Sequence, residues 1–300
     1  MLPKYPEFKT LEIDDLPLLS QHLNAAHPKI CELAAANLII WSDFDRVQLT
    51  IINHNLCLLI NPLNECPFFM EPLGDNLLPN TIEICLNHAQ KFSRIPASSL
   101  KNFPAEKFKI KELVSHADYI YERAVLAELK GKKFDGKRNH IKKFKSSFVQ
   151  YQFVPLAPKH QNEALQLFEN WFAFREASRF FPRLAHTAQK AAVENAFRFF
   201  DKLALLGGAI YAEGKMLGFI LGSRLNADTL AVHFSYGLPT VSGISQVLLQ
   251  AACQKTFAPF KYVNLEQDLG IPGLRQAKLS YHPIKIEKKF EAHLATLTTN

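Results

Sequence analysis

Two acidic residues are separated by a single residue in a polar segment near residue 265. Glu266 and Asp268 follow residues 262–265, whose composition predicts a short strand. Alternate residues of an extended segment share a face, so both carboxylates could reach one ligand. A carboxylate at the end of a strand could deprotonate an attacking amine, which is the role of a general base. Asn264 and Gln267 flank these acids and are candidates for substrate binding.

Two basic residues follow at helical spacing. Arg275 and Lys278 lie three residues apart within 270–281, a predicted short helix, so their side chains face the same way. Arginine suits bidentate recognition of a carboxylate or phosphate, and either residue could stabilise an oxyanion. The alternative is structural: Glu266 and Asp268 would form ion pairs with Arg275 and Lys278 that hold the helix in place.

A strongly basic segment covers residues 130–145. It contains eight Lys and Arg residues and one acid, Asp135, so its net charge of +7 equals that of the whole chain. Such a segment attracts phosphate-rich partners, namely a coenzyme, tRNA or anionic lipid headgroups. The alternative is a solvated helix surface. The residues expected to bind a phosphate-bearing substrate are Lys137, Arg138, Asn139 and Lys142.

A further polar group precedes the basic segment. Asp118, Tyr119 and Tyr121 are candidates for substrate binding. Residues 118–130 are predicted to be helical, an arrangement in which Asp118 and Tyr121 approach one another. For all of these residues to act together, segments 118–144 and 264–283 must form the walls of a common pocket.

The elements that position these residues are clearest in the second half of the chain. The turn signals Glu213-Gly214 and Asn226-Ala227-Asp228 indicate an antiparallel meander of three strands. The predicted order is strand 148–156, helices 159–174 and 187–202, strands 204–212, 215–225 and 229–237, helix 243–257, strand 262–265, helix 270–281 and strand 284–290.

The first half is predicted to follow a looser version of the same order. Asn80 and Glu83 resemble a capping box that opens a helix. Because no residue-level repeat relates the halves, any duplication is one of architecture. The predicted elements are strand 8–13, helices 14–23 and 29–37, strands 38–41, 48–52, 56–61 and 66–72, helix 80–92, strand 109–115, and helices 118–130 and 136–145.

Composition argues against several classes of protein. No apolar run reaches the ~18–20 residues that span a bilayer, and the first residues lack the apolar core of a signal peptide. We therefore expect no transmembrane segment and a cytoplasmic location. The five cysteines form no C-x-x-C pair and the histidines show no metal-binding spacing, so neither a disulfide framework nor a metal site is expected.

Two long strings of residues resemble one known family, of the DUF2156 type, which shares its domain with the C-terminal catalytic part of phosphatidylglycerol lysyltransferases. The resemblance covers nearly the whole chain. The strings are Asp118-Tyr119-Ile120-Tyr121 with Gly131-Lys132-Lys133 and Lys137-Arg138-Asn139, and Asn264-Leu265-Glu266-Gln267-Asp268-Leu269-Gly270 with Gly273-Leu274-Arg275, Lys278 and Ser280-Tyr281-His282-Pro283.

The resemblance implies a mixed α+β fold of two tandem GNAT (acyl-CoA N-acyltransferase-like) domains, which we expect at residues 1–145 and 146–300. It also implies an acyltransferase whose acceptor is a small molecule or a headgroup with an amine or hydroxyl. Tyr281 then becomes a candidate general acid for the leaving group, whereas its structural alternative is to pack the end of the helix.

The donor implied by the resemblance is acyl-CoA or aminoacyl-tRNA. Acyl-CoA users of this fold usually carry R/Q-x-x-G-x-G/A, whose backbone N–H groups bind the pyrophosphate. In residues 237–243 only Gly243 stands in the G-x-G/A part of this motif, where two glycines are expected, and no residue is basic, which favours aminoacyl-tRNA. Two alternatives stay open: an acetyl-CoA-dependent N-acetyltransferase, and a non-catalytic module that binds RNA or, by peripheral membrane contact, anionic headgroups.

Overall fold

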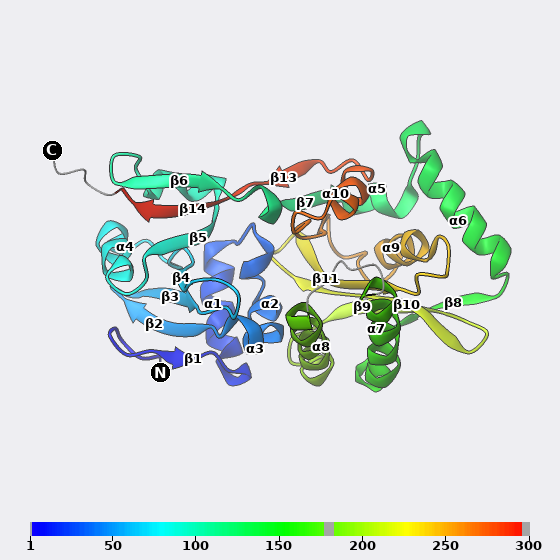
Figure 1. Ribbon diagram of the computed structural model, residues 1–300, viewed down its shortest axis with the longest axis horizontal. Coiled ribbons are helices and arrows are strands. Elements are labelled where there is room, and N and C mark those ends of the chain that lie inside the picture. Colours follow the sequence, from blue (N-terminus) through cyan, green and yellow to red (C-terminus); the bar gives the residue numbers. More distant parts are fainter. Residues whose placement is uncertain (1, 177–182, 296–300) are drawn as a thin grey trace. The chain divides into compact units, whose positions relative to one another are not determined.

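Two seven-stranded sheets carry the fold of the computed structural model, which describes residues 2–176 and 183–295 (Figure 1). The first sheet lies within one of two compact units, and most of the second sheet lies within the other. Within the described residues, the first unit comprises 2–118, 267–275 and 286–295, and the second comprises 119–266 and 276–285. The fold class is therefore mixed α+β, as the sequence predicts.

The sheet of the first unit has the strand order β1-β2-β3-β4-β5-β14-β6. Its last strand in sequence, β14, is inserted between β5 and β6 and runs antiparallel to both. The core beside it contains the contacting rings of Phe69, Phe92, Phe103 and Phe108. The strands are β1 (Lys9–Thr10), β2 (Gln48–Ile52), β3 (Asn55–Ile60), β4 (Phe68–Phe69), β5 (Lys91–Pro96), β6 (Phe108–Glu112) and β14 (Lys289–Leu294), and the helices are α1 (Leu16–Ala26), α2 (Ala35–Ile40), α3 (Ser42–Asp45) and α4 (Leu78–Leu86).

The sheet of the second unit has the strand order β13-β7-β12-β11-β10-β9-β8. Its strands are β7 (Asp118–Glu122), β8 (Tyr151–Pro155), β9 (Leu206–Ala212), β10 (Lys215–Arg224), β11 (Thr229–Gly237), β12 (Tyr262–Asn264) and β13 (Lys285–Glu287), and its helices are α5 (Arg123–Glu128), α6 (Asp135–Ser147), α7 (Gln161–Glu176), α8 (Arg183–Arg198), α9 (Ile244–Gln254) and α10 (Pro272–Leu279), the last of which begins in the first unit. From β8 onward the element order is the predicted one.

Helices cover both faces of this second sheet (Figure 1). On one face, Phe168 of α7 contacts Tyr236 of β11, and Phe197 of α8 contacts Phe219 of β10. On the other face, α9 and the apolar side of α6 share a core with residues of β9 to β12. The buried residues of α6 are Ile141 and Phe144, three apart, and they anchor a helix that is otherwise basic.

A β-bulge interrupts the pairing of β10 with β11. Gly222 pairs with Val232 and Leu221 pairs with Phe234, which leaves His233 between them as an extra residue. The alternation of β11 changes there: Val232 belongs to the core on the α9 side, whereas Phe234 stacks with the aromatic side chains on the α7 side. The bulge brings His233 next to Ser223 of β10.

Several predicted elements are wrong in type. Residues 118–122 form strand β7 rather than a helix, because Tyr119 and Tyr121 alternate into the core and β-forming side chains fit that position. Residues 38–40 belong to helix α2 rather than a strand, because all of 36–40 are buried and such a short apolar run carries no period of its own. Strand β5 was not predicted at all.

The division into units also differs from the expected boundary at residue 145. The first unit ends at Asp118, and helices α5 and α6 belong to the second unit because their apolar side chains complete its core. The predicted last strand, 284–290, is two strands, and β14 joins the sheet of the first unit. The chain therefore passes from one unit to the other several times.

Candidate functional site

Glu266 occupies a turn directly after β12. Its φ of 59° is left-handed, a conformation that costs a non-glycine residue about 1–2 kcal/mol. Two hydrogen bonds offset this cost: the Glu266 N–H donates to Asn264 Oδ1 at 2.7 Å, and the Tyr119 N–H donates to the Glu266 carbonyl at 3.3 Å. The buried Asn264 side chain therefore forms a turn that fixes the backbone of Glu266.

The Glu266 carboxylate is bound to a histidine of the neighbouring strand. His233 Nδ1 lies 2.9 Å from Glu266 Oε1, and His233 Nε2 lies 2.7 Å from Ser223 Oγ. The imidazole is fully buried, whereas the Glu266 side chain keeps 20% of its surface exposed. The arrangement presents one oriented carboxylate at the end of a strand, where ligands of α/β proteins commonly bind.

Lys278 supports the same turn from α10. Its Nζ donates to the Leu265 carbonyl at 2.6 Å and lies 5.7 Å from the ring centre of Tyr119. The Tyr121 hydroxyl donates to the Lys278 carbonyl at 2.8 Å. The second unit thus brings Tyr119 and Tyr121 into contact with the segment after β12, and the Lys278 ammonium is engaged with backbone.

Tyr281 is buried beside Lys137. The Lys137 ammonium lies 4.0 Å from the centre of the Tyr281 ring and donates to Ser280 Oγ at 2.6 Å. Burial raises the pKa of the Tyr281 hydroxyl above its ordinary value, which opposes release of a proton at neutral pH. Burial lowers the pKa of Lys137. The surroundings of Tyr281 match its structural alternative better than those of a general acid.

The predicted phosphate-binding residues of α6 differ in environment. Arg138 donates to the carbonyls of Leu129 and Gly131 and forms an ion pair with Asp135, so it caps the C-terminal end of α5. Asn139 and Lys142 are exposed on the helix surface. Lys142 is therefore available to a ligand, whereas the Arg138 guanidinium is occupied within the protein.

Asp268 and Arg275 pair with each other in the first unit. Arg275 donates to both carboxylate oxygens of Asp268, at 2.6 and 3.1 Å, and the Gly270 N–H adds a third bond at 2.8 Å. The Asp268 side chain is 1% exposed. This is the ion pair that the structural alternative describes, and it holds the start of α10.

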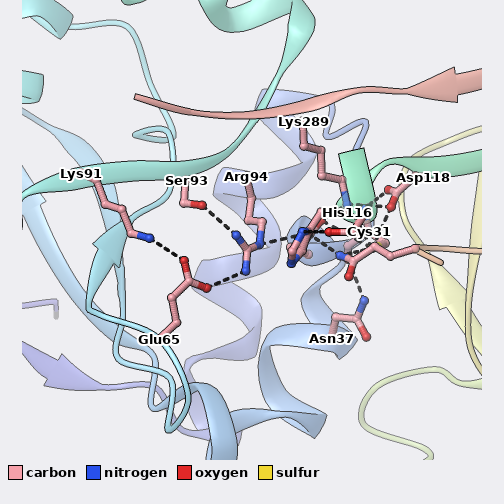
Figure 2. A network of polar contacts seen from close by, with 12 residues as sticks. Cys31, Asn37, Glu65, Lys91, Ser93, Arg94, His116, Asp118 and Lys289 are labelled. Carbon is pink, nitrogen blue, oxygen red and sulfur yellow. Dashed lines mark hydrogen bonds and ion pairs between the residues drawn. The ribbon is translucent and has the colours of Figure 1, made fainter. Parts of the chain in front are cut away.

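The first unit also contains a buried charged network that sequence reasoning missed (Figure 2). Lys289 Nζ donates to Asp118 Oδ1 at 2.6 Å and to Glu32 Oε2 at 2.5 Å, and Lys289 and Asp118 are both 0% exposed. The Cys31 N–H donates to Asp118 at 2.7 Å, and Gln267 Nε2 donates to Glu32 Oε1 at 2.5 Å. Two residues predicted to bind substrate, Asp118 and Gln267, are therefore bound in this network.

The charge of Lys289 is set by its neighbours. Burial alone would lower its pKa, but Asp118, Cys31 and Glu32 together raise it above the ordinary value. Sulfur and carboxylate atoms of Cys31, Glu32 and Asp118 lie within 4.8 Å of one another, a spacing that could suit a metal ion. Lys289 Nζ already places a positive charge between those carboxylates, and Arg94 lies 3.8 Å from Glu32, so cationic side chains take the place that a metal ion would fill.

The network continues along β5. Arg94 donates to Glu65 Oε2 and to Ser93 Oγ, each at 2.8 Å, and Lys91 donates to the other Glu65 oxygen at 2.5 Å (Figure 2). His116 lies near Arg94 and Lys289, and burial together with these cations lowers its pKa to about 4. The imidazole is therefore neutral at physiological pH. The partners are too far apart in sequence for any local pattern to reveal them.

Asp45 is the carboxyl group of α3 that faces this network. Burial raises its pKa to about 6; Arg94 opposes the shift, while Glu32 and Glu65 add to it. A carboxyl whose pKa is raised on folding favours the folded state at low pH. This contribution is lost as the pH rises from about 4 to about 6, so ionised Asp45 destabilises the protein above pH 6.

We expect Asp45→Asn to raise the free energy of unfolding by about 1–3 kcal/mol at pH 8, and by about 1–2 kcal/mol less at pH 4.5. Urea unfolding at the two pH values measures the difference. Asp43→Asn, at an exposed position of the same helix, is the control. An equal effect of Asp45→Asn at both pH values would contradict the assignment.

Comparison with solved structures places the chain among related folds. A conserved protein of unknown function from Bacteroides thetaiotaomicron is 28% identical, with a TM-score of 0.88 over 98% of this chain and 100% of that one. L-PGS from Bacillus licheniformis is 15% identical (TM-score 0.65, 98% and 93% coverage). The C-terminal domain (DUF2156) of a candidate lysylphosphatidylglycerol synthetase from Agrobacterium fabrum is 13% identical (TM-score 0.65, 93% and 91%).

The match to a family of sequences agrees with the comparison of structures. No curated protein matches the chain in sequence. Across residues 2–176 and 183–295, no helix has both the length and the apolar character needed to cross a bilayer. The family described as phosphatidylglycerol lysyltransferase, C-terminal, matches residues 24–293, which is most of the sequence. The chain therefore belongs to the family of phosphatidylglycerol lysyltransferase C-terminal domains.

Proposed function

We propose that this chain is an acyltransferase that moves an acyl or aminoacyl group to an amine or hydroxyl acceptor, with Glu266 as its general base. Family membership supports the class of reaction. The observation that carries the proposal is the Glu266 carboxylate, which is held by His233 at 2.9 Å, fixed in a left-handed turn and still partly exposed. A general base needs this combination of fixed orientation and access.

In this mechanism the acceptor attacks the donor carbonyl and loses its proton to Glu266. A new bond forms between the acceptor and the carbonyl carbon, the bond to the leaving group breaks, and the departing oxygen or sulfur takes the proton that Glu266 has accepted. Lys278 and Arg275 are engaged with Leu265 and Asp268, so we assign the oxyanion to backbone N–H groups. Strand β11 pairs with β12 over Thr229–Ala231. We propose that backbone N–H groups of β11 beyond this pairing donate to the oxyanion.

An aminoacyl-tRNA donor fits the second unit better than acyl-CoA. Gly243 precedes α9, where a coenzyme A user would place its phosphate loop. A Cβ atom at Gly243 would lie 2.2 Å from the carbonyl oxygen of His140, and its φ is 83°. This glycine is therefore explained by close packing against α6. Exposed lysines on α6 and just before it carry the positive charge that would attract a phosphate-bearing partner. They are Lys132, Lys133, Lys142, Lys143 and Lys145.

The acceptor in this proposal is a headgroup or a small molecule with a free hydroxyl or amine. The family description makes phosphatidylglycerol the first acceptor to test and lysyl-tRNA the first donor. A cytoplasmic location, where aminoacyl-tRNA is made, and peripheral contact with a membrane belong to the same proposal. Acetyl-CoA-dependent N-acetylation is the second candidate, on the strength of the GNAT-like element order of the second unit.

The test supplies radiolabelled lysyl-tRNA with phosphatidylglycerol vesicles, and separately acetyl-CoA with a panel of amines. We expect labelled lipid to form in the first reaction, and no binding of acetyl-CoA by calorimetry at millimolar concentration. Acetyl transfer would favour the second candidate. Salt-dependent binding of tRNA with no product from any charged tRNA or acetyl-CoA would instead indicate a non-catalytic module and contradict the proposal.

A further inference from the structure

Ser223, His233 and Glu266 form a chain of hydrogen bonds across three neighbouring strands. Ser223 is near the end of β10, His233 is the extra residue of the bulge in β11, and Glu266 follows β12. The distances are 2.7 Å from Ser223 Oγ to His233 Nε2 and 2.9 Å from His233 Nδ1 to Glu266 Oε1. The residue types, atoms and order are those of a serine–histidine–acid triad.

Two irregularities of the backbone build this chain. The bulge brings the His233 side chain beside Ser223, and the left-handed conformation of Glu266 turns its carboxylate toward the imidazole. Both features cost stability and persist only where the surrounding structure supports them. Both irregularities position contacts of the same histidine, which indicates a functional site.

Burial decides which end of the chain meets a substrate. A nucleophilic serine must be accessible, and the acid of such a triad is ordinarily buried. Here the order is reversed: Ser223 is 3% exposed, the His233 side chain is 0% exposed and the Glu266 side chain is 20% exposed. The carboxylate is the end of the chain that a substrate could reach, and the serine is the anchored end.

We propose that Ser223 and His233 are positioning residues that hold Glu266 for proton abstraction, in a serine–histidine–acid chain that works in the reverse of the usual direction. This inference rests on the proposed role of Glu266. It adds to the proposed site two residues that never touch the substrate, and it excludes an acyl-serine intermediate.

The hydrogen positions follow from the donors and acceptors. A carboxylate only accepts, so His233 Nδ1 must carry a hydrogen and donate it to Glu266. In the neutral ring Nε2 is then an acceptor, and the Ser223 hydroxyl donates to it. The carboxylate therefore selects the Nδ1–H tautomer, and the serine donates the hydrogen bond that holds Nε2. Without that hydroxyl the buried Nε2 has lost its hydrogen-bond donor, so the ring, and with it Glu266, is held less firmly.

Nitrogen-15 NMR of the full chain, labelled at histidine, tests the tautomer without any activity assay. His233→Gln identifies the His233 signals by their loss. We expect the wild-type ring to be the Nδ1–H tautomer, and Ser223→Ala to keep this tautomer but shift the Nε2 resonance, because Nε2 loses its hydrogen-bond donor. Ser223→Thr, which keeps a hydroxyl, and Ser235→Ala, at an exposed position of β11, should leave that resonance unchanged. A wild-type Nε2–H tautomer would overturn the inference.

Transfer kinetics supply the second arm. We expect Ser223→Ala to lower kcat about tenfold with KM changed less than twofold, Ser223→Thr to restore most of the rate, and His233→Gln to lower kcat about 100-fold. A loss in Ser223→Ala as large as that of Glu266→Gln, with an acyl adduct on Ser223 by mass spectrometry, would make the serine a nucleophile and refute positioning. If the wild type transfers nothing, the proposed function fails, and the NMR result still decides the tautomer.

Discussion

Glu266→Gln is expected to lower the rate of transfer by about 10²- to 10⁴-fold while the protein stays folded. Glutamine has nearly the same shape as glutamate, and its side-chain oxygen can still accept the hydrogen bond from His233 Nδ1. It cannot take a proton from the acceptor. The substitution therefore removes the basic group and keeps the geometry, so the loss should appear in kcat while KM changes little.

The control for this experiment is Glu128→Gln. Glu128 is an exposed glutamate of the second unit that pairs with Lys130, and its neutralisation should leave both the rate and the unfolding transition unchanged. Near wild-type transfer by Glu266→Gln, in an assay where the wild type is active, would remove Glu266 from the mechanism. A Glu266→Gln protein that no longer unfolds cooperatively would assign the carboxylate a structural role instead.

The architecture of the second unit is predictable because its signals are local. Strands β9, β10 and β11 are joined by short turns whose residues, Glu213-Gly214 and Asn226-Ala227-Asp228, are typical turn formers, and each strand is a dense apolar run. The helices that cover the sheet show a clear apolar stripe. In the first unit the strands are short and the apolar runs lack a period, so the sequence predicts a strand for part of α2 and no strand at β5.

The candidate site was only partly predictable, for a similar reason. Asn264 and Glu266 are recognisable as polar residues where a strand ends, and their spacing is that of the observed turn. The proposed role of His233 depends on a bulge. A bulge is a mismatch in the pairing of two strands, and the sequence of one strand alone does not reveal it. Ser223 joins the site only through that bulge. Pairings of this kind are set by register, which one strand's sequence does not contain.

The buried network of the first unit lies furthest from what sequence can predict. Lys289 meets Asp118 and Glu32, its partners from distant parts of the chain, because β14 returns to the sheet of the first unit. A lysine in the polar segment 285–289 would be predicted to lie on the surface, and the neighbouring residue, Lys288, does lie there. Lys289 is instead completely buried. Its removal is the strongest test of how the first unit holds together.

We expect Lys289→Met to lower the free energy of unfolding by about 3–5 kcal/mol, because it leaves the buried Asp118 carboxylate without its cation. The chain has two tryptophans, Trp41 in the first unit and Trp171 in the second, so urea unfolding in a Trp171→Phe background follows Trp41 alone. Lys288→Met, which removes an exposed lysine paired with Glu112, is the matched control and should cost less than about 1 kcal/mol.

The double variant Lys289→Met/Asp118→Asn separates charge from packing. If the unpaired carboxylate causes the loss, neutralising Asp118 should recover part of it, because asparagine can keep the bond from the Cys31 N–H and carries no charge. Glu32 would stay in place, with Gln267 as its hydrogen-bond donor. If the double variant is instead less stable than Lys289→Met by the full cost of Asp118→Asn alone, the two side chains are energetically independent. The ion pair would then not be what stabilises the first unit.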